Sequence, residues 1–159
     1  MTAVALPCHA FPNSDSEDDE PFDWLFKWEH FAAAGFTKFI PQDSKVLMLG
    51  CGNADFSADM YDSGVTTNIT NIDLSPVVID KMRKANLSRV GMSYHVMDVQ
   101  DLEFSDACFD VVIDKSTMDC IFCCADSTGI VCKMLEQAYR VLKPGGTYIC
   151  MSLHDDDKV

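Results

Sequence analysis

Basic residues are scarce in this 159-residue sequence, which has 12 lysines and arginines against 25 aspartates and glutamates and a formal net charge of −13. Nucleic-acid phosphates and anionic membrane surfaces repel such a chain, so we expect neither as a partner. A basic protein surface is the natural complement of this charge. Part of the acidity is local, because residues 14–20 read SDSEDDE, a composition typical of a solvated arm.

Long hydrophobic runs are also missing. No apolar stretch approaches the roughly 18 residues of a transmembrane helix, and the opening MTAVALPCHAF has neither the basic flank nor the long apolar centre of a secretory signal. We therefore expect a cytoplasmic protein whose eight cysteines stay reduced and pack as small buried hydrophobes. No second close pair follows the cluster of Cys120, Cys123, Cys124 and Cys132, so we expect no zinc site.

Hydrophobic residues make up 48% of the sequence and charged residues 23%, which is typical of one globular domain with its own core. We predict a flexible acidic arm over residues 1–20 and a folded core over residues 21–159. A helix is expected to begin near Pro21, because proline suits the first helical turn. Large aromatic side chains then recur at near-helical spacing, which indicates core packing or, for the first of them, a lid over a site: Trp24, Trp28, Phe31 and Phe39.

Apolar strand patterns alternate with helical patterns from residue 45 onward. The expected strands are KVLML (45–49), NITNID (68–73), SYHVMD (93–98), FDVVID (109–114) and TYICMSL (147–153). Amphipathic helices are expected between them, ending at Gly64, spanning 76–87 and spanning 130–142, with a turn at residues 144–146. Such alternation predicts parallel strands joined by right-handed crossovers, which is a doubly wound α/β sheet.

Ligands of such sheets bind outside the carboxyl ends of the strands, so the polar residues at these ends are the site candidates. Gly50 and Gly52 follow the first strand, and glycines there let the backbone approach a ligand closely. Asp73 ends the next strand, 23 positions after Gly50, where a carboxylate can accept two hydrogen bonds from a ribose diol. The two features together predict a nucleoside-type cofactor.

The residues after the glycines favour one cofactor class. A dinucleotide needs a third glycine at position 55 and a helix start that receives pyrophosphate. Asp55 stands there instead, with Asp59 one turn later, and both carboxylates would repel phosphate. S-adenosylmethionine carries a sulfonium cation and no phosphate, so an acidic rim suits it better than it suits a nicotinamide dinucleotide.

The segments VLMLGCGNADFS, NITNID, MDV (97–99) and FDVVIDKSTMD resemble successive motifs of the Rossmann-like, class I S-adenosylmethionine-dependent methyltransferases. The combination of LGCGN, MDV and DKSTMD, with FDW upstream, is similar to the methyltransferase-like 13 type, which includes the methyltransferase linked with endothelin-converting enzyme 2. The resemblance covers about residues 21–153. It implies S-adenosyl-L-methionine as cofactor and a lysine of a basic protein, such as translation elongation factor 1A, as substrate.

The resemblance also implies roles for the residues near the first two strands. Gly50 and Gly52 would line the methionine end of the cofactor, and Cys51 between them would also contact it. Asp73 and Leu74 would lie at its ribose.

Four further residues receive roles from the resemblance. Asp98 would accept a hydrogen bond from the adenine amino group, and the Val99 N–H would donate to a ring nitrogen. Lys115 would lie near the methionine moiety, and Trp24 would cover the cofactor. Structural alternatives stay open for three of them, since Asp98 could cap a turn, Lys115 could be solvated and Trp24 could belong to the core.

Methyl transfer to lysine requires an uncharged amine, because an ammonium group has no lone pair. A desolvated acidic pocket could receive the cation and let it lose its proton. Asp114 and Asp119 are our candidates for this pocket, Asp114 also as a cofactor contact, although Asp119 could equally cap a helix. No N-P-P-Y-type motif follows the fourth expected strand, which disfavours DNA or glutamine substrates.

Two departures from the family pattern bear on the prediction. The tyrosine–tryptophan–acid motif expected upstream is missing, and only HDDDKV follows TYICMSL, where a full domain continues through a helix and two antiparallel strands. We therefore expect the last strand to be an open edge that a homodimer or partner covers. The alternative function is a cofactor-binding module, or a truncated and inactive methyltransferase that works only with a partner.

Overall fold

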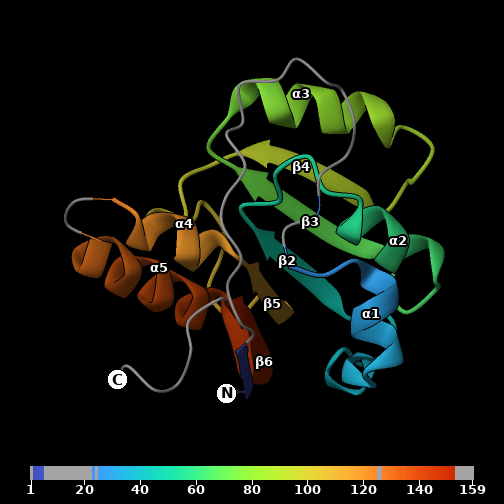
Figure 1. Ribbon diagram of the computed structural model, residues 1–159, viewed down its shortest axis with the longest axis horizontal. Helices are drawn as coiled ribbons and strands as arrows, with labels where there is room; N and C mark the ends of the chain where they lie inside the picture. The colour runs from blue at the N-terminus through green and yellow to red at the C-terminus, as the bar shows by residue number, and fades with distance from the viewer. Residues whose placement is uncertain (1, 6–22, 24, 125–126, 153–159) are drawn as a thin grey trace.

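The computed structural model describes residues 2–5, 23, 25–124 and 127–152 (Figure 1). Within them, six parallel strands form one sheet in the order β1-β6-β5-β2-β3-β4. The strands are β1 (Thr2–Ala5), β2 (Lys45–Leu49), β3 (Asn68–Asp73), β4 (Met92–Val96), β5 (Phe109–Lys115) and β6 (Leu142–Ser152). The helices are α1 (Trp28–Ala33), the 3-10 helix η1 (Phe36–Phe39), α2 (Phe56–Asp62), α3 (Pro76–Ala85), α4 (Thr117–Phe122) and α5 (Ser127–Val141).

Two hydrophobic cores cover the two faces of the sheet. In β2, Val46 and Met48 face the core that α1, α2 and α3 complete, while Leu47 and Leu49 face the core that α5 completes. Figure 1 shows these two groups of helices on either side of the sheet. Burial on both faces explains why the central strands read as continuous apolar runs rather than alternating ones. The predicted doubly wound α/β sheet is confirmed.

The strand order reverses at β2. From β2 the chain adds β3 and β4 on one side, then crosses back to add β5 and β6 on the other. The loops that follow β2 and β5 therefore leave the sheet in opposite directions and open a crevice at their carboxyl ends. This is the edge at which the glycines and acidic residues were expected.

The first helix begins later than the sequence suggested. Among the described residues, 23 and 25–27 are irregular, Leu25 has a φ of 69°, and α1 starts at Trp28. Trp28 and Phe31 are buried and stack with their ring centroids 5.4 Å apart. The expected helix start near Pro21 is therefore wrong for residues 23–27, while the core role of these two aromatic residues is confirmed.

The β6 edge is covered by the chain itself. β1 pairs in parallel with β6, from Thr2 opposite Ile149 to Ala5 opposite Ser152. The expectation of an open last strand is therefore wrong, and so is the reason for placing a homodimer or partner at this edge. Residues 2–5 are a strand rather than part of a flexible arm, and residues 6–20 lie outside the described part of the chain.

The expected turn at residues 144–146 is an irregularity inside β6. Phe109 of β5 pairs with Leu142, and Val111, two residues on, already pairs with Thr147. The intervening residues, including Pro144, leave the ladder, since proline lacks the N–H that a ladder needs.

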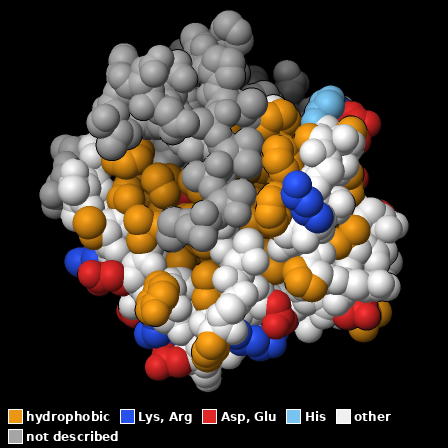
Figure 2. All heavy atoms as spheres, turned by 90° about the horizontal axis from the view of Figure 1, so that it is seen from below, with side chains coloured by type: hydrophobic (Ala, Val, Ile, Leu, Met, Phe, Trp, Pro, Cys, Tyr) orange, Lys and Arg blue, Asp and Glu red, His pale blue; other side chains and the backbone are white. Residues whose placement is uncertain are grey.

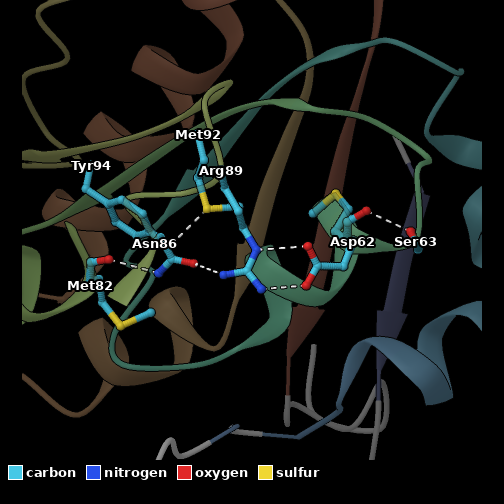
Figure 3. A network of polar contacts seen from close by, with 8 residues as sticks. Asp62, Ser63, Met82, Asn86, Arg89, Met92 and Tyr94 are labelled. Carbon is cyan, nitrogen blue, oxygen red and sulfur yellow. Dashed lines mark hydrogen bonds and ion pairs between the residues drawn. The ribbon is translucent and has the colours of Figure 1, made fainter. Parts of the chain in front are cut away.

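A polar network fastens α2 to the segment between α3 and β4 (Figure 3). Arg89 donates from Nε to Asp62 at 2.9 Å and from Nη1 to Asn86 at 2.7 Å, and Asn86 donates to the Met82 carbonyl at 2.8 Å. The hydrogen bond from Arg89 lowers the pKa of Asp62. The network holds the helix that follows the glycine turn.

Most cysteines are less buried than predicted. Cys51 and Cys150 are buried, and burial raises the pKa of each thiol to about 12. The four cysteines of the cluster, Cys120, Cys123, Cys124 and Cys132, are exposed on or beside α4 and α5, so the expectation of burial is wrong for them. In the described ranges no group of three or more His, Cys, Asp or Glu side chains could hold a metal ion.

Charged side chains lie mostly at the margin of the face shown in Figure 2, with acidic and basic groups interspersed. Hydrophobic side chains gather nearer the middle of the same face. Among the helices that the structure describes, none is both long and apolar enough to cross a membrane.

Candidate functional site

A cavity of about 440 Å³ opens at the carboxyl ends of β2, β3, β4 and β5. Its walls include residues 50–52 after β2, 73–74 at the end of β3, 97–100 after β4 and 115–117 at the end of β5. The volume lies in the range of small-molecule sites. Of the ten predicted cofactor contacts, eight line this cavity: Gly50, Cys51, Gly52, Asp73, Leu74, Asp98, Val99 and Lys115. Trp24 lies outside the described residues.

The glycine turn after β2 serves two purposes. Gly50 and Gly52 both have positive φ, 57° and 54°. A Cβ on Gly50 would lie 2.3 Å from Oγ1 of Thr117, whose hydroxyl donates to the Leu49 carbonyl at 2.8 Å. A Cβ on Gly52 would meet nothing within 4 Å. Gly50 therefore allows the loops after β2 and β5 to pack together, whereas Gly52 leaves bare backbone beside the cavity.

Asp73 is oriented by the backbone around it. Its Oδ2 accepts the Gly52 N–H at 2.9 Å, and its Oδ1 accepts the Ser75 N–H at 2.9 Å. Each carboxylate oxygen keeps a further acceptor site, so the pair can still receive two hydroxyl groups. The Gly52–Asp73 hydrogen bond joins the two features on which the prediction of a nucleoside cofactor depends.

Asp98 shapes the turn after β4. Its Oδ1 accepts the Gln100 N–H at 2.8 Å, and the Gln100 side chain lies 3.3 Å from Oδ2. The turn-capping alternative for Asp98 is thus what the structure shows. Both Asp98 and Val99 still line the cavity, so capping fixes the position of a wall residue.

Lys115 is buried in an ion pair. Its Nζ lies 3.1 Å from Oδ1 of Asp23, and the two side chains are only 5% and 7% exposed. The ammonium group also lies 5.6 Å from the ring centroid of Phe56. Burial lowers the pKa of Lys115, and Asp23 opposes that change. The alternative of a solvated lysine is wrong, and the ion pair attaches Asp23, which precedes α1 in the chain, to the cavity wall.

Asp114 and Asp119 do not line the cavity. Asp114 is fully buried on the other face of β5, where Oδ1 accepts the Thr117 N–H at 2.9 Å and Oδ2 accepts the Tyr148 hydroxyl at 3.1 Å. Burial raises the pKa of Asp114 to about 6. Asp119 is also buried and accepts a hydrogen bond from Ser152 at 2.5 Å. The two carboxylates hold the start of α4 and join α4 to β6.

Acidic residues gather where α2 begins. Asp55 immediately precedes the helix, and Asp59 lies in its first turn. Partial burial, followed by the nearby carboxylates of Asp55 and Asp23, raises the pKa of Asp59. Negative charge at this helix start repels a pyrophosphate group, which argues against a dinucleotide.

The wall and support residues that the sequence analysis missed include Asp23, Ser116 and Thr117. Ser116 and Thr117 directly follow the strand-end Lys115, so their place after a buried strand was an available signal. Asp23 had no such signal, because it meets Lys115 across 92 positions of sequence.

A family model described as a methyltransferase domain matches residues 40–158. An eEF1A lysine and N-terminal methyltransferase of Mus musculus is 44% identical over 119 residues, 73% of this chain and 17% of that protein. EEF1A lysine methyltransferase 4 of Mus musculus is 31% identical over 146 residues, 87% of this chain and 56% of that protein. The crystal structure of the PH0226 protein from Pyrococcus horikoshii OT3 superposes with a TM-score of 0.64 at 29% identity, covering 76% of this chain and 54% of the other.

The chain spans less than a fifth of the first of these relatives and about half of the second. The matched segment holds every predicted site residue except Trp24. The similarity therefore concerns the cavity and its walls.

Proposed function

This chain belongs to the class I S-adenosylmethionine-dependent methyltransferases, and we propose that it transfers a methyl group from S-adenosyl-L-methionine to a lysine side chain of a basic protein. The observation that carries the proposal is the Gly52–Asp73 hydrogen bond at the switch point of the sheet. It sets a bare backbone and an oriented carboxylate side by side on one cavity wall.

The cavity fits a nucleoside bearing an amino acid. Gly52 has no side chain that would project into the cavity, so a ligand can approach its backbone. Asp73 offers acceptor sites for a ribose diol. Asp98 and Val99 stand two strands away from the glycine turn, where we place the adenine. Lys115 and its neighbours stand on the opposite side, where we place the methionine part.

The chemistry is a displacement at carbon. When bound, the cofactor supplies a methyl group on a sulfonium centre, already activated toward attack. A lysine nitrogen that has released its proton to water would accept this methyl group, and S-adenosylhomocysteine would be the leaving group. The chain has to keep the lysine amine free of water and aligned with the methyl group. In this proposal the amine and the methyl group meet beside the cavity walls that follow β2 and β5.

The acidic residues have separate parts in this proposal. Asp55 and Asp59 at the start of α2 do not line the cavity but lie next to its wall residues in the chain, and in this proposal their charge attracts a lysine cation before it loses its proton. Asp114 and Asp119 act as positioning residues, because they fix the start of α4 and are not exposed to the cavity. This replaces the role in proton removal that the sequence suggested for them.

The proposed substrate is translation elongation factor 1A. Two groups of relatives carry eEF1A in their names, and a chain with a net charge of −13 complements a basic protein. We place the reaction in the cytoplasm, where this substrate works.

A transfer assay tests the proposal. The protein is incubated with radiolabelled S-adenosyl-L-methionine and purified elongation factor 1A, and label is followed into protein. We expect label in the factor with the wild type, none with Asp73→Ala, and wild-type labelling with Asp80→Asn, an exposed position on α3 away from the cavity.

Cofactor binding without transfer would contradict the proposed activity and favour the cofactor-binding module. Equal labelling by the wild type and Asp73→Ala would contradict the assignment of the cavity.

A further inference from the structure

The exposed cysteines at the end of α4 and on α5 have no role in the proposed function. They are Cys120, Cys123, Cys124 and Cys132. Cys120 and Cys124 line the cavity, whereas Cys123 and Cys132 do not. Residues 120–123 read CIFC, which is the C-x-x-C spacing of thiol pairs that form and break a disulfide.

The backbone at the end of α4 brings the two cysteines of this C-x-x-C segment together. The Cys123 N–H donates to the Cys120 carbonyl at 3.2 Å, and the Cys124 N–H donates to the Ile121 carbonyl at 2.9 Å. Both bonds span three residues, which is the tightened form of a last helical turn. Side chains three residues apart eclipse in such a turn, and helix geometry sets their Cα atoms about 5 Å apart. This separation lies within the range of about 4.4–6.8 Å that a disulfide requires.

Electrostatic effects also indicate that Cys123 is the nearer partner of Cys120. Burial raises the pKa of Cys120, and the negative charges of Asp119 and then of Cys123 raise it further. Cys124 acts on Cys120 more weakly than Cys123 does. The Cys123 thiol donates to the Asp119 carbonyl at 3.4 Å, a weak hydrogen bond that rotation about one side-chain torsion gives up.

We propose that Cys120 and Cys123 form a reversible disulfide that weakens cofactor binding in the adjoining cavity. The proposal deepens the proposed function and rests on it, since it presumes S-adenosylmethionine in the cavity. Cys120 belongs to the cavity wall and Cys123 does not, so the disulfide turns a wall sulfur toward a residue outside the wall. A bound cofactor packs against the reduced wall and therefore favours the open thiol pair. In the cytoplasm this pair stays reduced until an oxidant accumulates.

The oxidant that we assign is a hydroperoxide such as hydrogen peroxide. The exposed Cys123 attacks first, because its neighbour Cys120 has a raised pKa and stays a thiol. An S–O bond forms as the O–O bond breaks, and the released hydroxide takes a thiol proton and leaves as water. The Cys120 sulfur then displaces the hydroxyl group of this sulfenic acid, the S–S bond forms and a second water leaves. Two thiols and one peroxide thus give one disulfide and two waters.

Cofactor binding and oxidation must influence each other by the same factor. We expect oxidation to weaken the binding of S-adenosylhomocysteine about tenfold, which is a usual size for coupling between neighbouring sites. Saturating S-adenosylhomocysteine should then raise the reduction potential of the cysteine pair by about 30 mV. Equilibration in glutathione redox buffers with and without the ligand measures this shift.

Thiol counting and calorimetry on four chains test the proposal: the wild type, Cys123→Ser, Cys124→Ser and Cys132→Ser. Each chain is treated with hydrogen peroxide or with dithiothreitol, then unfolded, alkylated with N-ethylmaleimide and weighed by mass spectrometry. Parallel folded samples are titrated with S-adenosylhomocysteine. Cys132→Ser is the matched control, because it removes an exposed thiol that lies outside the cavity wall.

Peroxide should cost the wild type, Cys124→Ser and Cys132→Ser two alkylated thiols each. The oxidised wild type and oxidised Cys132→Ser should bind S-adenosylhomocysteine about tenfold more weakly than their reduced forms. Cys123→Ser should lose no pair of thiols, and its affinity should equal that of the reduced wild type with or without peroxide.

The proposal is overturned if Cys123→Ser still loses two thiols, or if Cys124→Ser or Cys132→Ser prevents the loss, since the disulfide would then join another pair. Equal affinity of the oxidised and reduced wild type would overturn it as well. A reduced, folded wild type that binds no S-adenosylhomocysteine would overturn the proposed function instead. The two failures are distinguishable, because the thiol count is made without ligand.

Discussion

Replacing each glycine of the cavity turn by alanine should separate stability from binding. In Gly50→Ala the new Cβ would lie 2.3 Å from the Thr117 hydroxyl, which must move and give up its hydrogen bond to the Leu49 carbonyl. In Gly52→Ala the new Cβ meets no atom of the chain within 4 Å. Both glycines have a φ in the left-handed region, so the backbone strain of an alanine is common to the two variants.

The magnitudes follow from these contacts. Left-handed backbone costs alanine about 1–2 kcal/mol, which is the whole effect expected on the stability of Gly52→Ala. Gly50→Ala adds about 1–3 kcal/mol for overpacking and about 0.5–1.5 kcal/mol for the lost hydrogen bond. Its total of about 2.5–6.5 kcal/mol approaches the whole stability of many domains of this size. Gly52→Ala should instead lose about tenfold or more in affinity for S-adenosylhomocysteine, because its methyl group enters the ligand space.

Urea unfolding and calorimetric titration measure the two effects. Gly145→Ala is the matched control, since Gly145 has a φ of 82°, an equally open Cβ position and no place in the cavity wall. It should lose stability like Gly52→Ala and keep full affinity. The reasoning would be refuted if Gly50→Ala proved as stable as Gly52→Ala. It would also be refuted if Gly52→Ala bound S-adenosylhomocysteine with unchanged affinity.

Two further predictions concern buried charge. Because burial raises the pKa of Asp114 from 3.8 to about 6, the folded state binds a proton that the unfolded state releases. Stability should therefore fall by up to about 3 kcal/mol as pH rises from about 4 to 6, and urea unfolding of Asp114→Asn at the same pH values should lack this fall; parallel profiles would contradict it. Asp23→Asn leaves the buried Lys115 cation without this partner and should lower the free energy of unfolding by about 3–5 kcal/mol. Lys115→Met in the same chain should restore part of that loss, and a cost below about 1 kcal/mol for Asp23→Asn would show that the pair contributes little.

The central strands could be predicted because they are buried on both faces. Residues 45–49 and 109–114 are largely apolar, residues 68–73 carry the β-branched Ile69, Thr70 and Ile72, and each segment became a strand within one residue of the expected bounds. The carboxyl ends of such strands converge, so Gly52 and Asp73 could be placed together before any contact was known.

Other elements carried no local signal. β1 is four residues long and depends on its pairing with β6, and α4 is a single six-residue helix whose start is held by Asp114. The burial of Lys115 depends on Asp23, which no periodicity relates to it. Asp114 looked like a cavity residue because it ends a strand, but alternation along β5 turns it to the opposite face from Lys115.

The most direct test of the cofactor assignment is calorimetric titration of the folded wild-type chain with S-adenosylhomocysteine, with NAD as the comparison ligand. We predict one binding site for S-adenosylhomocysteine and no detectable binding of NAD, because Asp55 and Asp59 repel pyrophosphate at the start of α2. A folded chain that binds no S-adenosylhomocysteine, or that binds NAD more tightly, would contradict the assignment of the cavity between the Gly50–Gly52 turn and Lys115.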